Sequence, residues 1–331
     1  MRYQSIDRAD DACQRALDAE LVEHVCRRAV GADHQVEAIT ELPWGTYNNA
    51  YRVDLRAGPP MVLRIAPERA RQYRVEAELM RNEYAVAPYL AGISELVPRI
   101  HFADFTHQMI DRDYLLQSFL PGVPAPEAMG QSARPRWASL FHQIGTITRS
   151  IHEVAGRAFG PVANARFTSW GAAVVAHFRS VAEDLQDTGH VRDLADEAER
   201  LSDVLDEITE PRLLHGDGWT VNFLVDPGSD ELTVTGLCDW DRAEWGDPLA
   251  DWAIQRALLR PGTEREAFWI GYGQPRTVAS GIRQEIYRAR HLLGLRLDLI
   301  RPGRSSGAPT DDEIATNDQE VGEILDRLRS T

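Results

Sequence analysis

Lysine is absent from this 331-residue chain, and all 36 basic residues are arginine. A phosphate-binding loop of the GxxxxGK[ST] type is therefore excluded, and so is catalysis through a lysine Schiff base. Any phosphate contact by a cationic side chain must come from arginine. This side chain keeps its proton and binds oxygen atoms as a planar fork.

Cysteine and long apolar runs are also scarce. Cys13, Cys26 and Cys238 are too few and too scattered for a disulfide framework or a zinc site. No apolar run approaches the roughly 18 residues of a membrane span, and the first residues have no apolar core of a signal peptide. We therefore expect a cytoplasmic protein that has no membrane partner.

Positive charge is in deficit, with 36 basic against 51 acidic residues and a formal net charge of −15. Such a field repels the nucleic-acid backbone, so no nucleic-acid partner is expected. It attracts cationic ligands, although an acidic total also serves solubility.

Hydrophobic periodicity divides the chain into a β-rich part and a helical part. Residues 11–30 and 68–91 have helical spacing, and five short segments rich in β-formers lie between and after them. These segments are Gln35–Leu42, Tyr47–Leu55, Met61–Ala66, Ile100–Asp104 and Tyr114–Phe119. We predict an α+β fold with two lobes, in which residues 1–119 carry an initial helix and a five-stranded antiparallel sheet.

The rest of the chain, residues 120–331, is predicted to be mainly helical. The helical segments are 135–155, 169–186, 190–208, 248–272, 278–300 and 311–329. One β patch interrupts them, formed by Asn222–Val225 and Thr233–Cys238 around a Pro-Gly turn.

The stretch Leu213–Val225 carries the most chemistry. An apolar segment runs into His215-Gly-Asp217, Asn222 follows five residues after the aspartate, and the next apolar run ends at Asp239. Phosphoryl transfer needs one carboxylate at the attacking hydroxyl and oxygen ligands that hold Mg²⁺ against the phosphates. A single Asp or Asn of this kind is more often a turn former.

The pattern His215-x-Asp217-x₄-Asn222 followed by Asp239 resembles the signature of the aminoglycoside phosphotransferase family, small-molecule kinases with a protein-kinase-like fold. The run Asp239–Trp252 is similar to that family's D-W-x-x-A-x-x-G-D-P-x-x-D-[LW] motif. The resemblance is strong over residues 213–252 and looser over about 35–300.

This resemblance implies a bilobal kinase-like fold and a role for each matching residue. Asp217 would be the catalytic carboxylate, and Asn222 and Asp239 would be ligands of Mg²⁺. His215 and Asp251 would support the catalytic loop, with Asp251 accepting backbone N–H bonds. The co-substrate would be ATP or GTP.

The same resemblance extends to the nucleotide site. Arg64 stands where protein kinases have the strand lysine that contacts phosphates, and an arginine fork suits those oxygens. Its expected ion-pair partner is Glu83, with Glu76 and Glu78 as competitors. The alternative is a solvent-facing strand arginine.

Two further segments occupy nucleotide-contacting places in the resemblance. The turn Trp44–Asn49 replaces the glycine-rich loop but keeps only Gly45, so it either approaches a phosphate through its backbone or is a plain hairpin turn. The segment after residue 114 resembles the hinge, which would bring the backbones of Ser118 and Leu120 to the purine edge.

The expected acceptor is a small hydroxylated molecule. Asp241 and Glu244 lie beside the predicted metal site, and with the acidic total they favour a cationic acceptor such as an aminoglycoside or another antibiotic. A metabolite of the choline, homoserine, methylthioribose or fructosamine type is the alternative.

A third hypothesis, an inactive nucleotide-binding regulator, is disfavoured because it has no chemical need for an intact Asp217, Asn222 and Asp239. Only six residues separate Asp239 from Gly246, too few for a protein-kinase activation segment. A monomer and a homodimer are equally compatible with the sequence.

Overall fold

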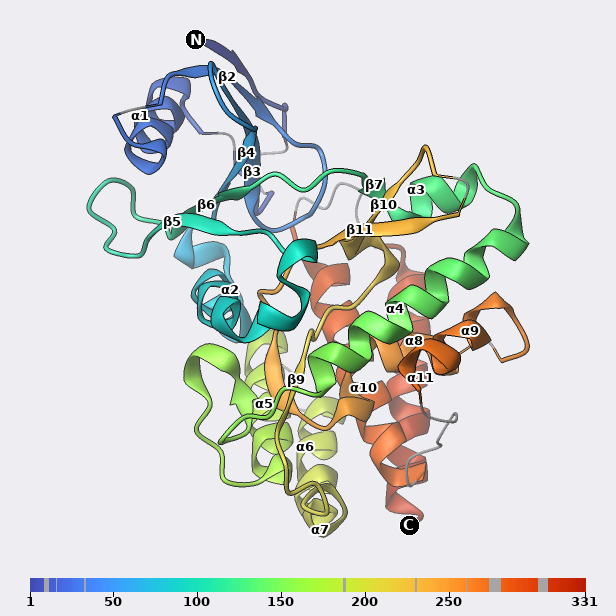
Figure 1. Ribbon diagram of the computed structural model, residues 1–331. Helices are drawn as coiled ribbons and strands as arrows, with labels where there is room; N and C mark the ends of the chain where they lie inside the picture. Colours follow the sequence, from blue (N-terminus) through green and yellow to red (C-terminus); the bar gives the residue numbers. More distant parts are fainter. Residues whose placement is uncertain are drawn as a thin grey trace.

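The structure, a computed structural model, describes residues 1–8, 12–15, 17–32, 34–186, 189–229, 231–259, 261–273, 281–302 and 309–331. Its largest sheet has six strands in the order β1-β2-β3-β4-β6-β5. They are β1 (Arg2–Gln4), β2 (Val36–Glu41), β3 (Asn49–Leu55), β4 (Met61–Ile65), β5 (Ile100–Asp104) and β6 (Tyr114–Ser118). Figure 1 shows this sheet at one end of the molecule and most helices at the other.

The prediction of five strands was wrong, because β1 adds a sixth at the edge and runs parallel to β2. Three residues without an alternating apolar pattern give little strand signal. Tertiary contacts hold β1 instead: the Tyr3 ring lies 6.4 Å from that of Tyr51, and its hydroxyl donates to the carbonyl of Leu17.

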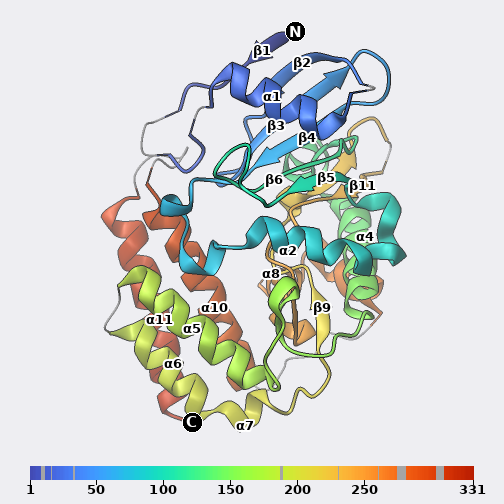
Figure 2. The same cartoon turned by 90° about the vertical axis from the view of Figure 1, so that its left-hand side faces the viewer.

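Helix α1 (Ala19–Val30) covers one face of the sheet (Figure 2). It begins later than residue 11 because Asp18 caps it, accepting the backbone N–H groups of Glu20 and Leu21. Its apolar face packs on alternating residues of the strands, which include the buried Tyr51.

The predicted helix over 68–91 is broken into shorter pieces. These are the 3₁₀ helices η1 (Arg69–Arg71), η2 (Arg74–Glu76) and η3 (Ala87–Leu96), with α2 (Leu79–Val86) between the last two. The backbone N–H groups of Arg74 and Val75 donate to the carboxylate of Asp184 at 2.8 and 3.1 Å. These bonds to another helix replace the intrahelical pattern that periodicity alone suggested.

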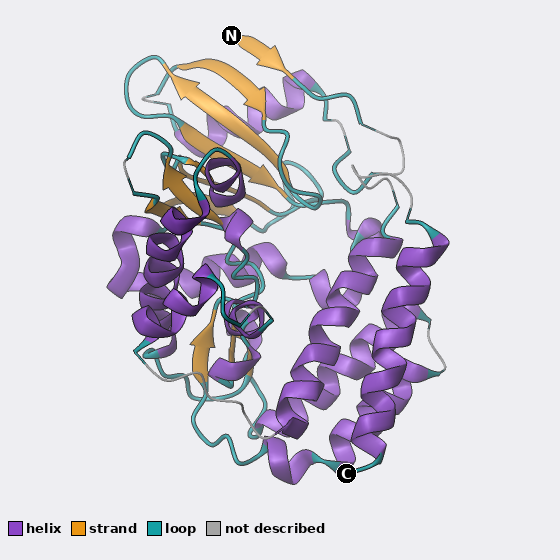
Figure 3. Cartoon of the chain, turned by 90° about the vertical axis from the view of Figure 1, so that its right-hand side faces the viewer, coloured by secondary structure: helices purple, strands orange, loops and turns teal. Residues whose placement is uncertain are grey.

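The second half of the chain is mainly helical (Figure 3). Its helices are α3 (Ala125–Gly130), α4 (Trp137–His152), α5 (Trp170–Leu185), α6 (His190–Arg200), α7 (Ser202–Leu205), α8 (Trp252–Leu258), α9 (Ala267–Tyr272), α10 (Gly281–Ile300) and α11 (Asp311–Arg329). Predicted helices over 190–208 and 248–272 are each divided, and residues 278–280 of another lie outside the described residues. No described helix has both the length and the hydropathy to cross a membrane.

Two three-stranded sheets place the loops of the functional site. One joins β11 (Thr233–Leu237), β10 (Phe223–Asp226) and β7 (Val123–Pro124). The other joins β8 (Gly160–Pro161), β12 (Glu244–Gly246) and β9 (Arg212–Leu214). Because β9 precedes Asp217 and β11 precedes Asp239, these two sheets bring the predicted catalytic and metal-binding loops together.

Candidate active site

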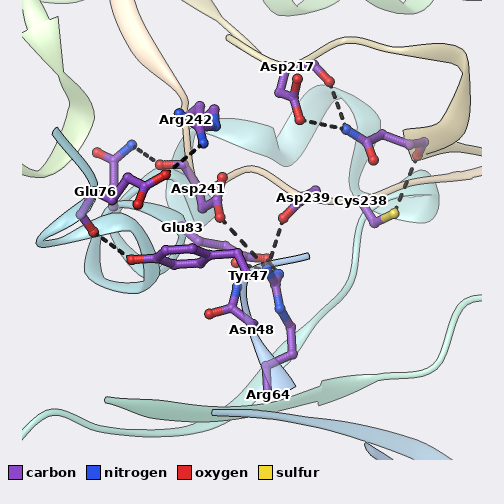
Figure 4. Close-up of polar contacts among 12 residues, drawn as sticks. Tyr47, Asn48, Arg64, Glu76, Glu83, Asp217, Cys238, Asp239, Asp241 and Arg242 are labelled. Carbon is purple, nitrogen blue, oxygen red and sulfur yellow. Dashed lines mark hydrogen bonds and ion pairs between the residues drawn. The ribbon is translucent and has the colours of Figure 1, made fainter. Parts of the chain in front are cut away.

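Asp217 and Asn222 lie in one loop between β9 and β10. The side-chain amide of Asn222 donates to the backbone carbonyl of Asp217 at 2.8 Å and to its carboxylate at 3.1 Å (Figure 4). Burial raises the pKa of Asp217 to about 7, while the nearby charge of Arg242 opposes this rise. The loop therefore holds a carboxyl group that can gain or lose a proton near neutral pH.

His215 and Asp251 hold this loop in place through hydrogen bonds. The Asp251 carboxylate accepts the backbone N–H of His215 at 2.9 Å, which is the contact that the family motif predicted. The His215 ring accepts the N–H of Asp217 at Nδ1, so Nε2 carries the proton and donates to the carbonyl of Cys238 at 3.2 Å. Burial lowers the pKa of His215 and keeps the ring neutral.

Arg64 and Glu83 form a buried ion pair across β4 and α2. One guanidinium nitrogen of Arg64 donates to both carboxylate oxygens of Glu83, at 2.6 and 2.5 Å. Arg64 pairs with Glu83 rather than with Glu76 or Glu78, and it does not face solvent because it is only 8% exposed. Nearby carboxylates raise the pKa of Arg64 against the effect of burial.

The other terminal nitrogen of Arg64 reaches the loop after β11, donating to the carboxylate of Asp239 at 2.9 Å. The backbone of Asp239 has a φ of 66°, in the left-handed region that costs non-glycine residues about 1–3 kcal/mol. A strained aspartate at this position indicates that the direction of its carboxylate matters more than local backbone energy.

A cavity of about 440 Å³ opens beside these groups. Asp217, Asp241 and Glu244 all contribute to its wall. Glu244 already accepts from Arg290 at 3.0 and 3.1 Å, and Asp241 is buried 3.9 Å from Arg64. The two acidic residues therefore lie at the expected place, but protein cations partly neutralise them.

Three further residues, Gly45, Ser118 and Leu120, were predicted from the sequence to contact the nucleotide. Gly45 is in the hairpin turn between β2 and β3, with a φ of 83° that favours glycine. The N–H of Ser118 donates to the carbonyl of Arg99 at 2.9 Å, so this donor is already engaged. The N–H of Leu120 makes no such bond to the described residues.

Sequence reasoning missed three buried or half-buried supports. Glu76 accepts hydrogen bonds from two arginines of the second half of the chain, Arg242 and Arg301. Asn82 donates to the carbonyls of Asp241 and Ala243 at 2.8 and 2.7 Å and so holds the segment after Asp239. Arg242 lay at a variable position of the motif, and only long-range contacts reveal its partner.

Comparisons with known proteins identify the family of this chain. The family model described as "Phosphotransferase enzyme family" matches residues 38–284, and no curated protein gives a significant match. Among solved structures, the GDP complex of aminoglycoside 2'-phosphotransferase-IIIa is 15% identical with a TM-score of 0.60, covering 94% of this chain and 99% of that chain.

Two other solved structures are similarly related. A candidate fructosamine-3-kinase from Thermobifida fusca is 19% identical with a TM-score of 0.61, covering 92% of this chain and 98% of that chain. The streptomycin–ATP ternary complex of APH(2″)-IIa is 14% identical with a TM-score of 0.58, covering 94% and 97%. At such identities the structures establish the fold, and the family match establishes membership. The chain belongs to the phosphotransferase enzyme family and is a small-molecule phosphotransferase.

Proposed function

We propose that this protein transfers the γ-phosphate of ATP or GTP, with Mg²⁺, to a hydroxyl group of a small molecule. The observation that carries the proposal is the Asp217–Asn222 pair, with Asp217 in the cavity wall, together with the Arg64–Glu83–Asp239 chain, which reaches that wall through Asp241 at 3.9 Å from Arg64. GDP and ATP complexes among the similar structures support a nucleotide co-substrate.

The donor atoms fit a magnesium ion. The amide nitrogen of Asn222 is used by Asp217, which leaves its side-chain oxygen for a cation, and only one oxygen of Asp239 accepts from Arg64. Mg²⁺ commonly takes one or two protein oxygens and completes its shell with phosphates and water. When bound, the ion would neutralise phosphate charge.

Asp217 would orient the acceptor hydroxyl and accept its proton. The hydrogen bond from Asn222 holds the carboxylate in one place, and positioning supplies much of the catalysis in phosphoryl transfer. Arg64 would hold the nucleotide phosphates, with Glu83 fixing the direction of the guanidinium. We assign nucleotide binding to residues 1–119, including Gly45 and the backbone of Ser118, with the backbone of the adjoining Leu120, and the acceptor site to the rest of residues 120–331.

An aminoglycoside or another antibiotic remains the first acceptor class to test, which would make the protein a cytoplasmic resistance enzyme. Streptomycin is present in one of the similar structures. A metabolite acceptor is the second candidate, because the Glu244–Arg290 pair removes one of the two acidic groups that favoured a polycation.

A coupled nucleotide-consumption assay tests the proposal. ATP and GTP would be offered with a panel of antibiotics, polyols, amino alcohols and sugar amines, with and without EDTA. We expect consumption with one acceptor class, its loss with EDTA and its return with Mg²⁺. Asp217→Asn keeps the shape of the side chain and should lower turnover by ~10²–10⁴ while nucleotide still binds.

Near-wild-type turnover in Asp217→Asn would contradict the assignment of the catalytic carboxylate. Absence of nucleotide binding by the wild-type protein, measured by calorimetry with Mg²⁺, would contradict the proposed function itself.

A further inference from the structure

Arg242 extends into the cavity next to Asp217. Both residues line the same cavity, and the Arg242 side chain is 35% exposed. Arg242 forms its ion pair with Glu76 rather than with Asp217, at 3.3 Å. Figure 4 shows its guanidinium between Glu76 and the Asp217 loop. A partly exposed cation therefore lines the same cavity as the predicted catalytic carboxylate.

The backbone of Arg242 is locked to the catalytic loop. A Cβ atom on Gly216 would lie 2.1 Å from the carbonyl oxygen of Arg242, and Gly216 has a φ of 76°. Only glycine permits this close approach without a shift of the backbone. The positions of Asp217 and Arg242 are thus set relative to one another by direct backbone contact.

The side chain of Arg242 is held from the opposite side. Glu76 is 1% exposed and also accepts two hydrogen bonds from Arg301, at the end of α10. Its backbone carbonyl accepts the hydroxyl of Tyr47 at 3.0 Å. Glu76 is therefore a fixed anchor, and Arg242 can keep one direction without a ligand.

Two other arginines near the site form ion pairs of their own. Arg64 contacts Glu83 and Asp239, on the predicted metal side. Arg290 contacts Glu244 through both carboxylate oxygens. The residues between Asp217 and Asn222 contain no basic side chain. Arg69, Arg74 and Arg166 also line the cavity, but Arg242 is the cavity arginine whose backbone meets the catalytic loop at Gly216.

We propose that Arg242 is a further catalytic residue, whose guanidinium contacts the phosphoryl group as it passes from the nucleotide to the acceptor. This inference rests on the proposed function. The acceptor oxygen forms its bond to phosphorus while the bond from phosphorus to the β,γ-bridging oxygen breaks. The electron pair of that bond stays on the nucleoside diphosphate, and the hydroxyl proton goes to Asp217. Preorganised donors aimed at charge in a transition state contribute strongly, and arginines do so in phosphoryl transfer.

A transition-state mimic tests the contact without any acceptor. Calorimetry would compare binding of Mg²⁺ with ADP or GDP in the absence and presence of aluminium fluoride, a mimic of the transferring phosphoryl group. We expect fluoride to tighten binding to the wild-type protein and to give Arg242→Ala less than a tenth of that gain. Equal gains in both proteins would overturn the inference. Failure of the wild-type protein to bind the diphosphate would instead count against the proposed function.

Steady-state kinetics give the second test, with the identified acceptor or with water as acceptor. Arg242→Ala should lower kcat by about 10²–10³-fold, as loss of one transition-state donor does, with a nearly unchanged KM for the nucleotide. Arg242→Lys should recover part of the loss, and added guanidinium should raise the turnover of Arg242→Ala. A purely structural role would allow no such rescue.

Arg179→Ala is the matched control, because it removes an exposed arginine that pairs with Glu199 on the surface. It should keep wild-type kcat, and thermal unfolding should show all variants folded. A kcat of Arg242→Ala within threefold of wild type, or a loss that neither lysine nor guanidinium repairs, would overturn the inference.

Discussion

At the scale of single residues, Arg64 is the side chain to which we assign the role of the missing lysine. The chain has no lysine for the phosphates, and its strand arginine is buried with a carboxylate on either side. A guanidinium is planar and can donate from two nitrogens at once, so it contacts Glu83 through one and Asp239 through the other. A lysine ammonium has the same charge but lacks this fixed fork.

This geometry predicts distinct effects of substitutions at Arg64. Arg64→Ala should raise the nucleotide KM and lower kcat, because the side chain both binds and orients phosphates. Arg64→Lys should recover part of both, and Glu83→Gln should give a milder loss. Initial-rate kinetics over a range of nucleotide concentrations provide the measurement.

Stability must be separated from function in this test, since Arg64→Ala leaves Glu83 buried without a partner. Breaking a buried pair in this way costs about 3–5 kcal/mol. The double variant Arg64→Met, Glu83→Leu removes both charges and should regain most of that stability while staying inactive. An active double variant would refute the phosphate role of Arg64.

At the scale of elements, the close packing of α4 on α9 supports the catalytic loop. A Cβ atom on Gly271 would lie 1.9 Å from the carbonyl oxygen of His142. The next residue, Tyr272, starts a chain of hydrogen bonds toward the catalytic loop. Its hydroxyl is hydrogen-bonded to His152 at 2.8 Å, and His152 is hydrogen-bonded to Asp251 at 3.0 Å. Asp251 in turn accepts the N–H of His215 in the catalytic loop.

Gly271→Ala should therefore force α9 away from α4. We expect a loss of about 1–3 kcal/mol, typical of overpacking, and lower activity through displacement of the Tyr272 hydroxyl. Urea unfolding and kcat would be measured together. Gly322→Ala on α11 is the control, because its nearest contact is an ordinary 3.7 Å, and alanine in a helix interior should stabilise by about 0.5–1 kcal/mol. Equal stability of the two variants would contradict the packing argument.

At the scale of the whole molecule, Glu76 joins distant parts of the chain. It pairs with Arg301 at the end of α10, 225 residues away, and with Arg242, 166 residues away. The guanidinium of Arg301 also lies 4.9 Å from the ring centre of Tyr73 and 5.5 Å from that of Tyr47. The turn before β3, the catalytic region and the last helices thus meet at one buried carboxylate.

Removal of this carboxylate should loosen the whole molecule. Glu76→Ala removes the buried partner of Arg301, a residue only 4% exposed, and leaves it only Asp298 at 3.4 Å as a carboxylate partner among the described residues. Breaking a buried pair in this way costs about 3–5 kcal/mol. Denaturant unfolding is the measurement. Arg74→Ala breaks the exposed pair with Glu183 and should cost less than about 1 kcal/mol. Equal losses in the two variants would show that the buried network adds nothing.

Much of the fold and of the candidate site could be predicted from the local sequence. The spacing of His215, Asp217, Asn222 and Asp239 indicated the phosphotransferase family, because phosphoryl transfer needs these groups in one short loop and one neighbouring turn. Short segments rich in β-formers placed five strands of the main sheet to within a few residues of their ends. Both signals are local, so neither depends on knowing which distant segments meet.

The tertiary structure decided what depends on distant partners. The short strand β1 has no periodic signal, and parallel pairing with β2 alone defines it. Asp184 breaks the expected helix over 68–91 from more than a hundred residues away, and Arg290 neutralises Glu244 from α10. Likewise, the sequence left Glu76 as one of three candidate partners of Arg64, whereas in the structure it pairs with Arg301. A charged residue on a helix face acquires its partner only when the chain packs. Hydrophobic periodicity contains no information about which distant residue that partner is.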